Sequence, residues 1–141
     1  MILTTVPKDT LLTREGEEKS NLFLIKKGEV LVFINKKSAI IPLGKLGPGD
    51  YLGELSFFDQ KPRSAYSLSL SNVEVEVYEK DELSKEIPAW LKEFGSSLAR
   101  KIRDNDRRLE EAQFRPRPIG EEVSLSQEEQ GRIYRLISQP K

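Results

Sequence analysis

The stretch "NLFLIKKGEVLVFI", residues 21–34, decides the fold that we expect for this chain. Two apolar runs flank a Lys-Lys-Gly-Glu break, which predicts two strands joined as a hairpin that turns at Gly28. From about Lys8 to Glu79 short apolar runs alternate with turn signals in the same way. This pattern is typical of an antiparallel barrel or sandwich.

Further strands follow in the same region. In "AYSLSLS", residues 65–71, and "VEVEVY", residues 73–78, every second residue is apolar, which predicts strands with one buried face. "SAIIPLGKL", residues 38–46, also has strand character, and Pro42 places it at a sheet edge or strand end. The turn-rich "LGPGDYLGE", residues 46–54, comes next.

After Lys80 the sequence becomes helical. "KDELSKEI", residues 80–87, predicts a short helix that ends before Pro88. The longest helix should run from about Ala89 to Gln113, with a coiled-coil seam in which one member is polar. The seam consists of Leu91, Phe94, Leu98, Ile102, Asn105 and Leu109. We therefore expect a homodimer formed through helix 89–113.

The C-terminal part combines a linker with one more helix. Two prolines in "FRPRPIG", residues 114–120, predict an extended linker. Ser126 stands three residues before Glu129, the spacing of a capping box, so a tail helix should begin there. We expect this helix to be short and interrupted at Gly131, and such a helix needs a partner surface to be stable.

Composition excludes several classes of function. The chain has 23 basic and 23 acidic residues and neither His nor Cys, so no His- or Cys-ligated metal, thiolate nucleophile or His base is available. We therefore expect that the protein is not an enzyme and that it has neither a metal site nor a catalytic residue. The balanced charge disfavours direct DNA binding. Without a signal sequence or an apolar membrane span, the expected location is cytoplasmic and no membrane partner is expected.

The segment "GELSFFDQKPRSA", residues 53–65, carries the candidate site. An ionised Glu54 only accepts hydrogen bonds, so a hydroxyl such as that of a ribose suits it. Arg63 offers a planar fork that matches a phosphate, Ser64 adds a hydroxyl, and Ala65 leaves space. A cyclic nucleotide satisfies all of these together. Alternatively, Glu54 and Arg63 pair with each other across a surface loop.

These residues resemble the cyclic-nucleotide-binding domains of the catabolite activator and FNR type. That family's phosphate-binding cassette reads Gly-Glu-Leu-small, a variable stretch, then Arg-Ser/Thr-Ala, which matches residues 53–56 and 63–65. The resemblance covers residues 6–114. It implies a mainly β fold with C-terminal helices: an antiparallel β-roll or jelly roll, a long dimerisation helix and here a short tail helix. We divide the chain into the roll (1–88, cassette 53–65), the long helix (89–114) and the linker with tail helix (115–141).

The resemblance also implies the roles of the site residues. Glu54 would bond the ribose 2′-hydroxyl, and Arg63 would neutralise the cyclic phosphate. The implied ligand-binding set is Gly53, Glu54, Leu55, Ser56, Arg63, Ser64 and Ala65, with Asn105 and Asp106 reaching the purine. Asn105 in a seam can equally fix the register of a dimer. Cyclic AMP is the first choice of ligand, cyclic GMP or a cyclic dinucleotide are alternatives, and no cofactor is expected.

The expected function is that of a stand-alone cyclic-nucleotide sensor that acts through an unidentified protein partner. "GRIYRLI", residues 131–137, resembles the opening helix of the family's winged-helix DNA-binding domain, but no recognition helix follows it in the sequence. The alternative is a protein-interaction scaffold that keeps the fold and no longer uses nucleotide.

Overall fold

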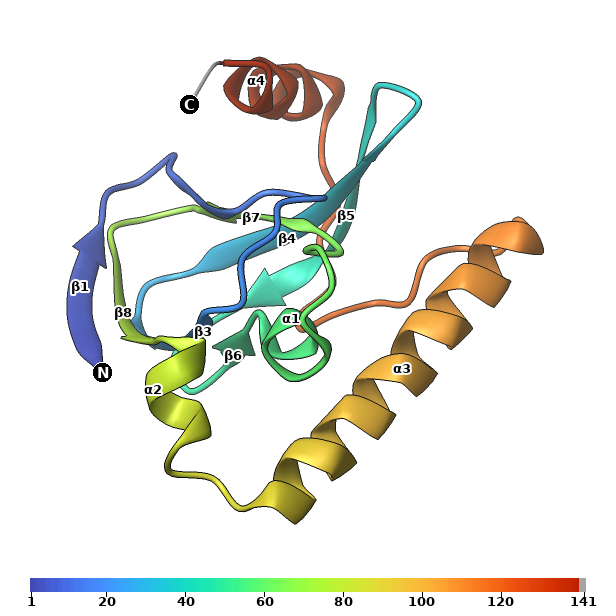
Figure 1. The fold of residues 1–141 in the computed structure, drawn as a ribbon. Helices are drawn as coiled ribbons and strands as arrows, with labels where there is room; N and C mark the ends of the chain where they lie inside the picture. The colour runs from blue at the N-terminus through green and yellow to red at the C-terminus, as the bar shows by residue number, and fades with distance from the viewer. Residues whose placement is uncertain (140–141) are drawn as a thin grey trace.

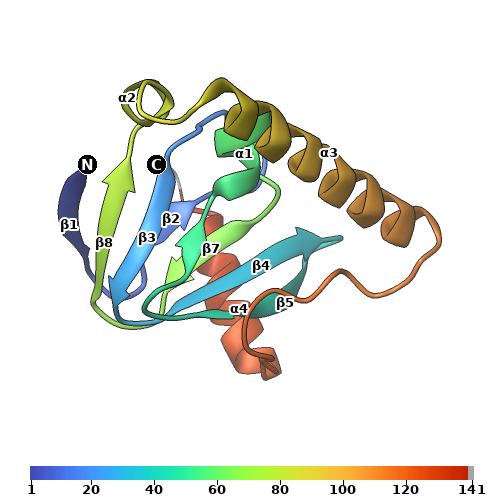
Figure 2. The ribbon, with the colours of Figure 1, turned by 90° about the horizontal axis from the view of Figure 1, so that it is seen from below.

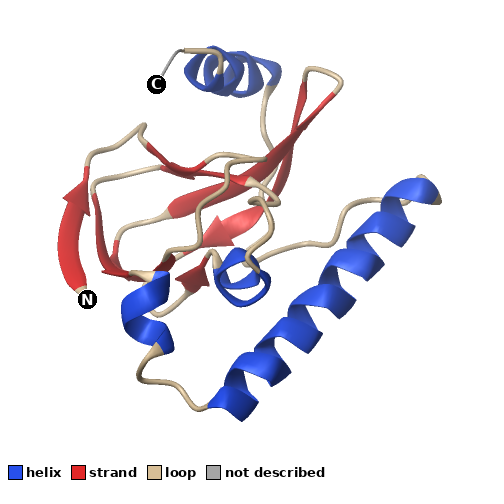
Figure 3. Ribbon diagram, viewed as in Figure 1, coloured by secondary structure: helices blue, strands red, loops and turns tan. Residues whose placement is uncertain are grey.

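The computed structural model describes residues 1–139 and arranges eight strands in two four-stranded antiparallel sheets (Figures 1 and 3). The first sheet has the order β1 (Ile2–Val6), β8 (Val73–Tyr78), β3 (Leu22–Lys27), β6 (Tyr51–Leu52). The second has the order β2 (Leu11–Thr13), β7 (Tyr66–Ser69), β4 (Val30–Lys36), β5 (Ala39–Leu46). The predicted jelly roll is confirmed.

The predicted hairpin at Gly28 is wrong in its pairing. The turn is present, but β3 pairs with β6 and β8 whereas β4 pairs with β5 and β7, so the two strands lie in different sheets. Gly28, with φ 90°, forms a corner between the sheets, and a Cβ there would lie 2.6 Å from the Asn72 carbonyl oxygen. A second corner crosses beside it, where the Leu70 amide donates to the Glu29 carbonyl at 2.9 Å. Alternation identifies a strand but not its partner.

The core lies between the two sheets, and the alternation along β4 shows how it forms. Val30 and Val32 pack inside the roll with Ile25 and Val75. Leu31 and the other intervening β4 side chains turn to the outer face of the second sheet, as the period of two requires. That outer face is apolar and needs a cover.

Four helices complete the structure: α1 (Glu54–Asp59), α2 (Lys80–Ser84), α3 (Ala89–Glu111) and α4 (Gln127–Ile137). α3 ends two residues before the predicted end at Gln113, which has a left-handed φ of 60°. The predicted capping box of Ser126 and Glu129 begins α4, but the helix continues through Gly131, so the expected interruption is wrong. Within residues 1–139 no helix is both long and apolar enough to cross a membrane.

α3 packs against α1 (Figures 1 and 2). Gly95 and Ala99 are the buried residues of α3, and a Cβ on Gly95 would lie 2.1 Å from the Phe58 ring. The Ser96 hydroxyl donates to the Phe58 carbonyl at 2.7 Å. The helix is thereby fixed beside the segment that carries the candidate site.

Residues 115–121, which we name the crossing segment, pair with β5, the edge strand on which Pro42 was predicted to lie. The Ile119 amide donates to the Leu43 carbonyl at 2.7 Å. Lys45 and Glu121 exchange two backbone hydrogen bonds of 2.8 and 2.9 Å. The predicted extended linker is therefore docked, and it covers a strand edge that would otherwise be open.

Beyond the crossing segment, α4 covers the outer face of the second sheet, on the opposite side of the roll from α3 (Figure 1). Ile133 is only 1% exposed and packs in one cluster with Leu31, Phe33 and Leu68. The partner surface that the short tail helix was predicted to need is thus supplied by the roll itself.

Candidate functional site

Both ends of the predicted cassette line one small cavity between β6, α1 and the loop that precedes β7. We name it the cassette cavity; its volume is about 60 Å³. The lining includes residues 53–56 and 63–65, which the sequence had assigned to one site. The other lining residues are Thr13, Val32, Leu46, Tyr51, Leu52, Arg117 and Ile119.

Arg63 is buried in the wall of this cavity, with 5% of its surface exposed. Its guanidinium donates to the Gly53 carbonyl at 3.1 Å and to the Asn21 carbonyl at 2.8 Å. Burial lowers the pKa of Arg63, and the negative charges of Glu17 and Glu54 act against that shift. A cation held away from water in this way is suited to an anion.

Gly53 is required for this arrangement. Its φ of 86° is left-handed, and a Cβ would lie 2.4 Å from Nη1 of Arg63 and 2.9 Å from the Asn21 carbonyl oxygen. A side chain at this position would therefore strain the backbone and displace the guanidinium.

Glu54 is the first residue of α1 and lies at the rim of the cassette cavity, with much of its side chain exposed. Partial burial of the carboxyl group raises the pKa of Glu54, while the positive charges of Arg117 and then Arg63 lower it. Within residues 1–139 no ion pair joins Glu54 to Arg63. The two groups therefore do not satisfy one another as a closed surface pair.

The remaining cassette residues close the cavity. Leu55 and Ser56 are buried, and Ser64 is exposed at the opening. The Thr13 hydroxyl donates to the Ala65 carbonyl at 3.1 Å, which fixes the strand that follows.

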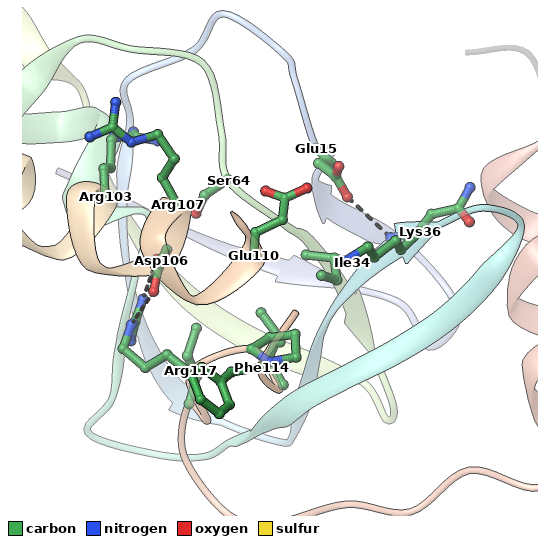
Figure 4. A pocket seen from close by; sticks show the side chains of 14 residues that line it. Glu15, Ile34, Lys36, Ser64, Arg103, Asp106, Arg107, Glu110, Phe114 and Arg117 are labelled. Carbon is green, nitrogen blue, oxygen red and sulfur yellow. Dashed lines mark hydrogen bonds and ion pairs between the residues drawn. The ribbon is translucent and has the colours of Figure 1, made fainter. Parts of the chain in front are cut away.

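A second cavity of about 330 Å³ lies between α3, β4 and the crossing segment, and we name it the helix cavity (Figure 4). Its lining is Glu15, Ile34, Asn35, Lys36, Leu43, Ser64, Arg103, Asp106, Arg107, Glu110, Phe114, Pro116, Arg117 and Ile119. Asp106, which was predicted to contact the purine, lines this cavity. Asn105 is exposed and lines neither cavity, so the structure does not bring it to the cassette.

Three residues of the site were missed from the sequence. Arg103 donates to the carboxylate of Asp59, with one bond of 3.1 Å, and to the Ser56 hydroxyl at 3.3 Å, which ties α3 to the cassette. Arg117 donates to Asp106 at 3.0 and 3.3 Å (Figure 4), and Ile119 packs against the core. Gly44, inside a predicted strand, was the one signal that another backbone approaches there.

A roll that closes a cassette around a buried arginine, with a long helix beside it, defines a ligand-binding class of domain. The model of one family, the cyclic nucleotide-binding domain, matches residues 3–87. The chain belongs to this family, whose members are ligand-binding regulatory domains.

Individual relatives agree with this assignment. The chain is 27% identical over 112 residues to the cyclic AMP receptor protein of Thermus thermophilus, covering 77% of this chain and 52% of that protein. It is similar in structure to the cAMP-bound form of the EAL enzyme Bd1971 (TM-score 0.64, 26% identity, 79% of this chain and 32% of that one). It shares the fold of the Thermus thermophilus catabolite activator protein (TM-score 0.63, 24% identity, 79% and 55%). The chain thus spans about half of the curated relative.

Proposed function

We propose that this chain is a cyclic-nucleotide sensor without enzymatic activity, with cyclic AMP as its ligand. The observation that carries the proposal is the convergence of residues 53–56 and 63–65 on one cavity with Arg63 buried in its wall. Arg63 would neutralise the phosphate, and Glu54 at the rim would accept from the ribose hydroxyl. Relatives described as a cyclic AMP receptor or as cAMP-bound support this ligand; the same EAL enzyme also has a cGMP-bound form.

The base would occupy the helix cavity. Ser64 lines both cavities, so the cassette cavity, where the phosphate would bind, lies next to the cavity that Asp106 lines on α3. A volume of about 330 Å³ is in the range of small-molecule sites. Because Arg103 links α3 to the cassette helix, a shift of one on ligand binding would be passed to the other.

Calorimetric titration with cyclic AMP, cyclic GMP and a cyclic dinucleotide tests the proposal. We expect cyclic AMP to bind with a Kd below roughly 100 µM, which corresponds to about 5–6 kcal/mol. AMP is the matched control, because it keeps the base and ribose but lacks the cyclic, singly charged phosphate. Equal binding of AMP, or no binding of any cyclic nucleotide, would show that the cassette is not used in this way.

We also propose that the signal leaves through α3, as a homodimer that engages a protein partner. Trp90, Phe94 and Leu98 are 66%, 57% and 44% exposed on this helix, an apolar stripe that a second copy would cover. Leu98→Glu should shift the sedimentation of the protein from dimer to monomer. A Leu98→Glu protein that sediments like the unsubstituted one would contradict a homodimer formed through this seam.

A second candidate function is an interaction scaffold that does not use nucleotide. The observation in its favour is that Arg63 already donates to two backbone carbonyls and that the cassette cavity measures only about 60 Å³. Both features would have to change for a ribose phosphate to bind. A partner captured equally well with and without cyclic AMP, and by Arg63→Ala, would favour the scaffold.

A further inference from the structure

The crossing segment stands where a nucleotide would join the two cavities. Arg117 and Ile119 line the cassette cavity and the helix cavity alike, as Ser64 does, so the crossing segment supplies two of the three residues of the partition that separates the cavities. With the partition in place the cassette cavity measures about 60 Å³, well below the roughly 300 Å³ at which small-molecule sites begin. A ligand that places its phosphate on one side and its base on the other cannot pass through this wall.

The segment is held at both ends by contacts that can be exchanged. Arg117 pairs with Asp106, and the side chains of this pair are 37% and 34% exposed. Ile119 packs against the partly covered edge of the core, and three backbone hydrogen bonds join residues 119–121 to β5. A strand edge with so few bonds opens locally at low cost compared with the core.

Arg117 of the segment interacts with the two acceptors that a nucleotide would use. Arg117 is the strongest cationic neighbour of Glu54, the carboxylate that would otherwise accept from a ribose hydroxyl. Arg117 also donates a hydrogen bond to the carboxylate of Asp106, the one predicted purine contact that lines a cavity. Arg117 thus donates to the acceptor on one side of the partition, and its positive charge acts on the acceptor on the other side.

We propose that residues 115–121 are a built-in competitor of the nucleotide: they fill the mouth of the roll in the free protein and must leave when a nucleotide binds. The inference rests on the proposed function, since it names what regulates that site. The apparent affinity for the nucleotide equals the intrinsic affinity multiplied by the fraction of time that the segment is undocked. A segment that is docked about nine-tenths of the time therefore weakens binding about tenfold.

Gly44 offers a selective test. A Cβ on Gly44 would lie 1.2 Å from the Ile119 carbonyl oxygen and 2.3 Å from its carbon, and the next nearest atom, at 3.2 Å, also belongs to the crossing segment. Its φ is not left-handed, so Gly44→Ala should expel the segment and leave the roll unstrained. Gly47→Ala is the matched control, because a Cβ there meets nothing within 4 Å.

Two measurements on the full chain follow, with cyclic AMP as the probe. Hydrogen exchange should show that Gly44→Ala, or cyclic AMP added to the unsubstituted protein, frees the Ile119 and Glu121 amides. Calorimetry should show cyclic AMP binding about tenfold or more tightly to Gly44→Ala than to the unsubstituted protein, with Gly47→Ala unchanged. Ile119→Asp, which places a carboxylate against the core, is a second way to release the segment and should act in the same direction.

The outcomes separate this inference from the proposed function. Equal affinity in a variant whose Ile119 amide has become exchangeable overturns the competitor and leaves the sensor intact. Failure of both substitutions to free these amides, or added protection on cyclic AMP binding, also overturns it. If cyclic AMP binds neither the unsubstituted protein nor the released variants, the proposed function fails and the competitor with it. Binding by the released variants alone supports both.

Discussion

Replacing Arg63 by Ala should lower both the affinity for cyclic nucleotide and the stability of the free protein. The side chain is 5% exposed and donates to the carbonyls of Gly53 and Asn21 at 3.1 and 2.8 Å. Hydrogen bonds from a charged donor contribute about 1.5–3 kcal/mol each, and the burial cost of the charge offsets part of the sum. We expect a loss of about 2–4 kcal/mol in the free energy of unfolding.

The effect on the ligand is a separate quantity. Removing one partner of a buried charge pair costs about 2–5 kcal/mol, so the Kd for cyclic AMP should rise by about 30-fold to several thousand-fold. Urea unfolding followed by circular dichroism measures the first effect, and calorimetry on the folded variant measures the second. Arg100→Ala, at an exposed site on α3, is the matched control and should change neither.

Arg63→Lys keeps the charge and covers the case in which the alanine variant does not fold. A lysine has no planar fork and cannot reproduce the two directed bonds to Gly53 and Asn21, so its affinity should lie between those of the other two proteins. Affinity for cyclic AMP that stays within twofold in a folded Arg63 variant would refute the assignment of this guanidinium to the phosphate.

Three further outcomes are expected. Glu54→Gln should stabilise the free protein at neutral pH, because burial raises the pKa of Glu54 and ionising this carboxyl group therefore costs folding free energy. This gain in stability should vanish as the pH falls through the raised pKa. Urea unfolding midpoints with the opposite pH trend would contradict this prediction. Arg103→Ala should lower the free energy of unfolding by about 1–3 kcal/mol, and this loss should not add to that of Asp59→Ala, because the two side chains form one ion pair. Additive losses in the double-mutant cycle would contradict an interaction between α1 and α3 through this pair. Ile133→Ala should cost about 2–4 kcal/mol of docking energy and free the α4 amides to exchange, whereas unchanged protection would mean that α4 is held otherwise.

The fold was largely readable from the sequence because its signals are local. Period-two alternation gave the strands of residues 66–78, Pro42 gave an edge, and Ser126 with Glu129 gave the start of α4. The pairing at Gly28 was misassigned because a tight turn between two strands is the same in a hairpin and in a corner between sheets. Long-range pairing distinguishes them, because β3 pairs with β6 and β8 whereas β4 pairs with β5 and β7.

Only part of the candidate site could be predicted from the sequence. The resemblance to the family's cassette grouped Glu54 and Arg63, and the structure brings both to one cavity. Arg117 could not be predicted, because its meaning arises from the return of the chain to β5, and Pro-rich sequence predicts extension without saying what it lies against. Gly44 carried the hidden signal, since a glycine within an edge strand leaves room for another backbone.

An NMR titration of the labelled protein with cyclic AMP shows whether residues 53–56 and 63–65 form a cyclic-nucleotide site. We expect the largest saturable shifts on the amides of Gly53, Glu54, Ser64 and Ala65, and we expect Arg63→Lys to need a higher concentration of cyclic AMP to reach saturation. Shifts confined to other surfaces, or none at millimolar cyclic AMP in either the unsubstituted protein or Gly44→Ala, would contradict such a site.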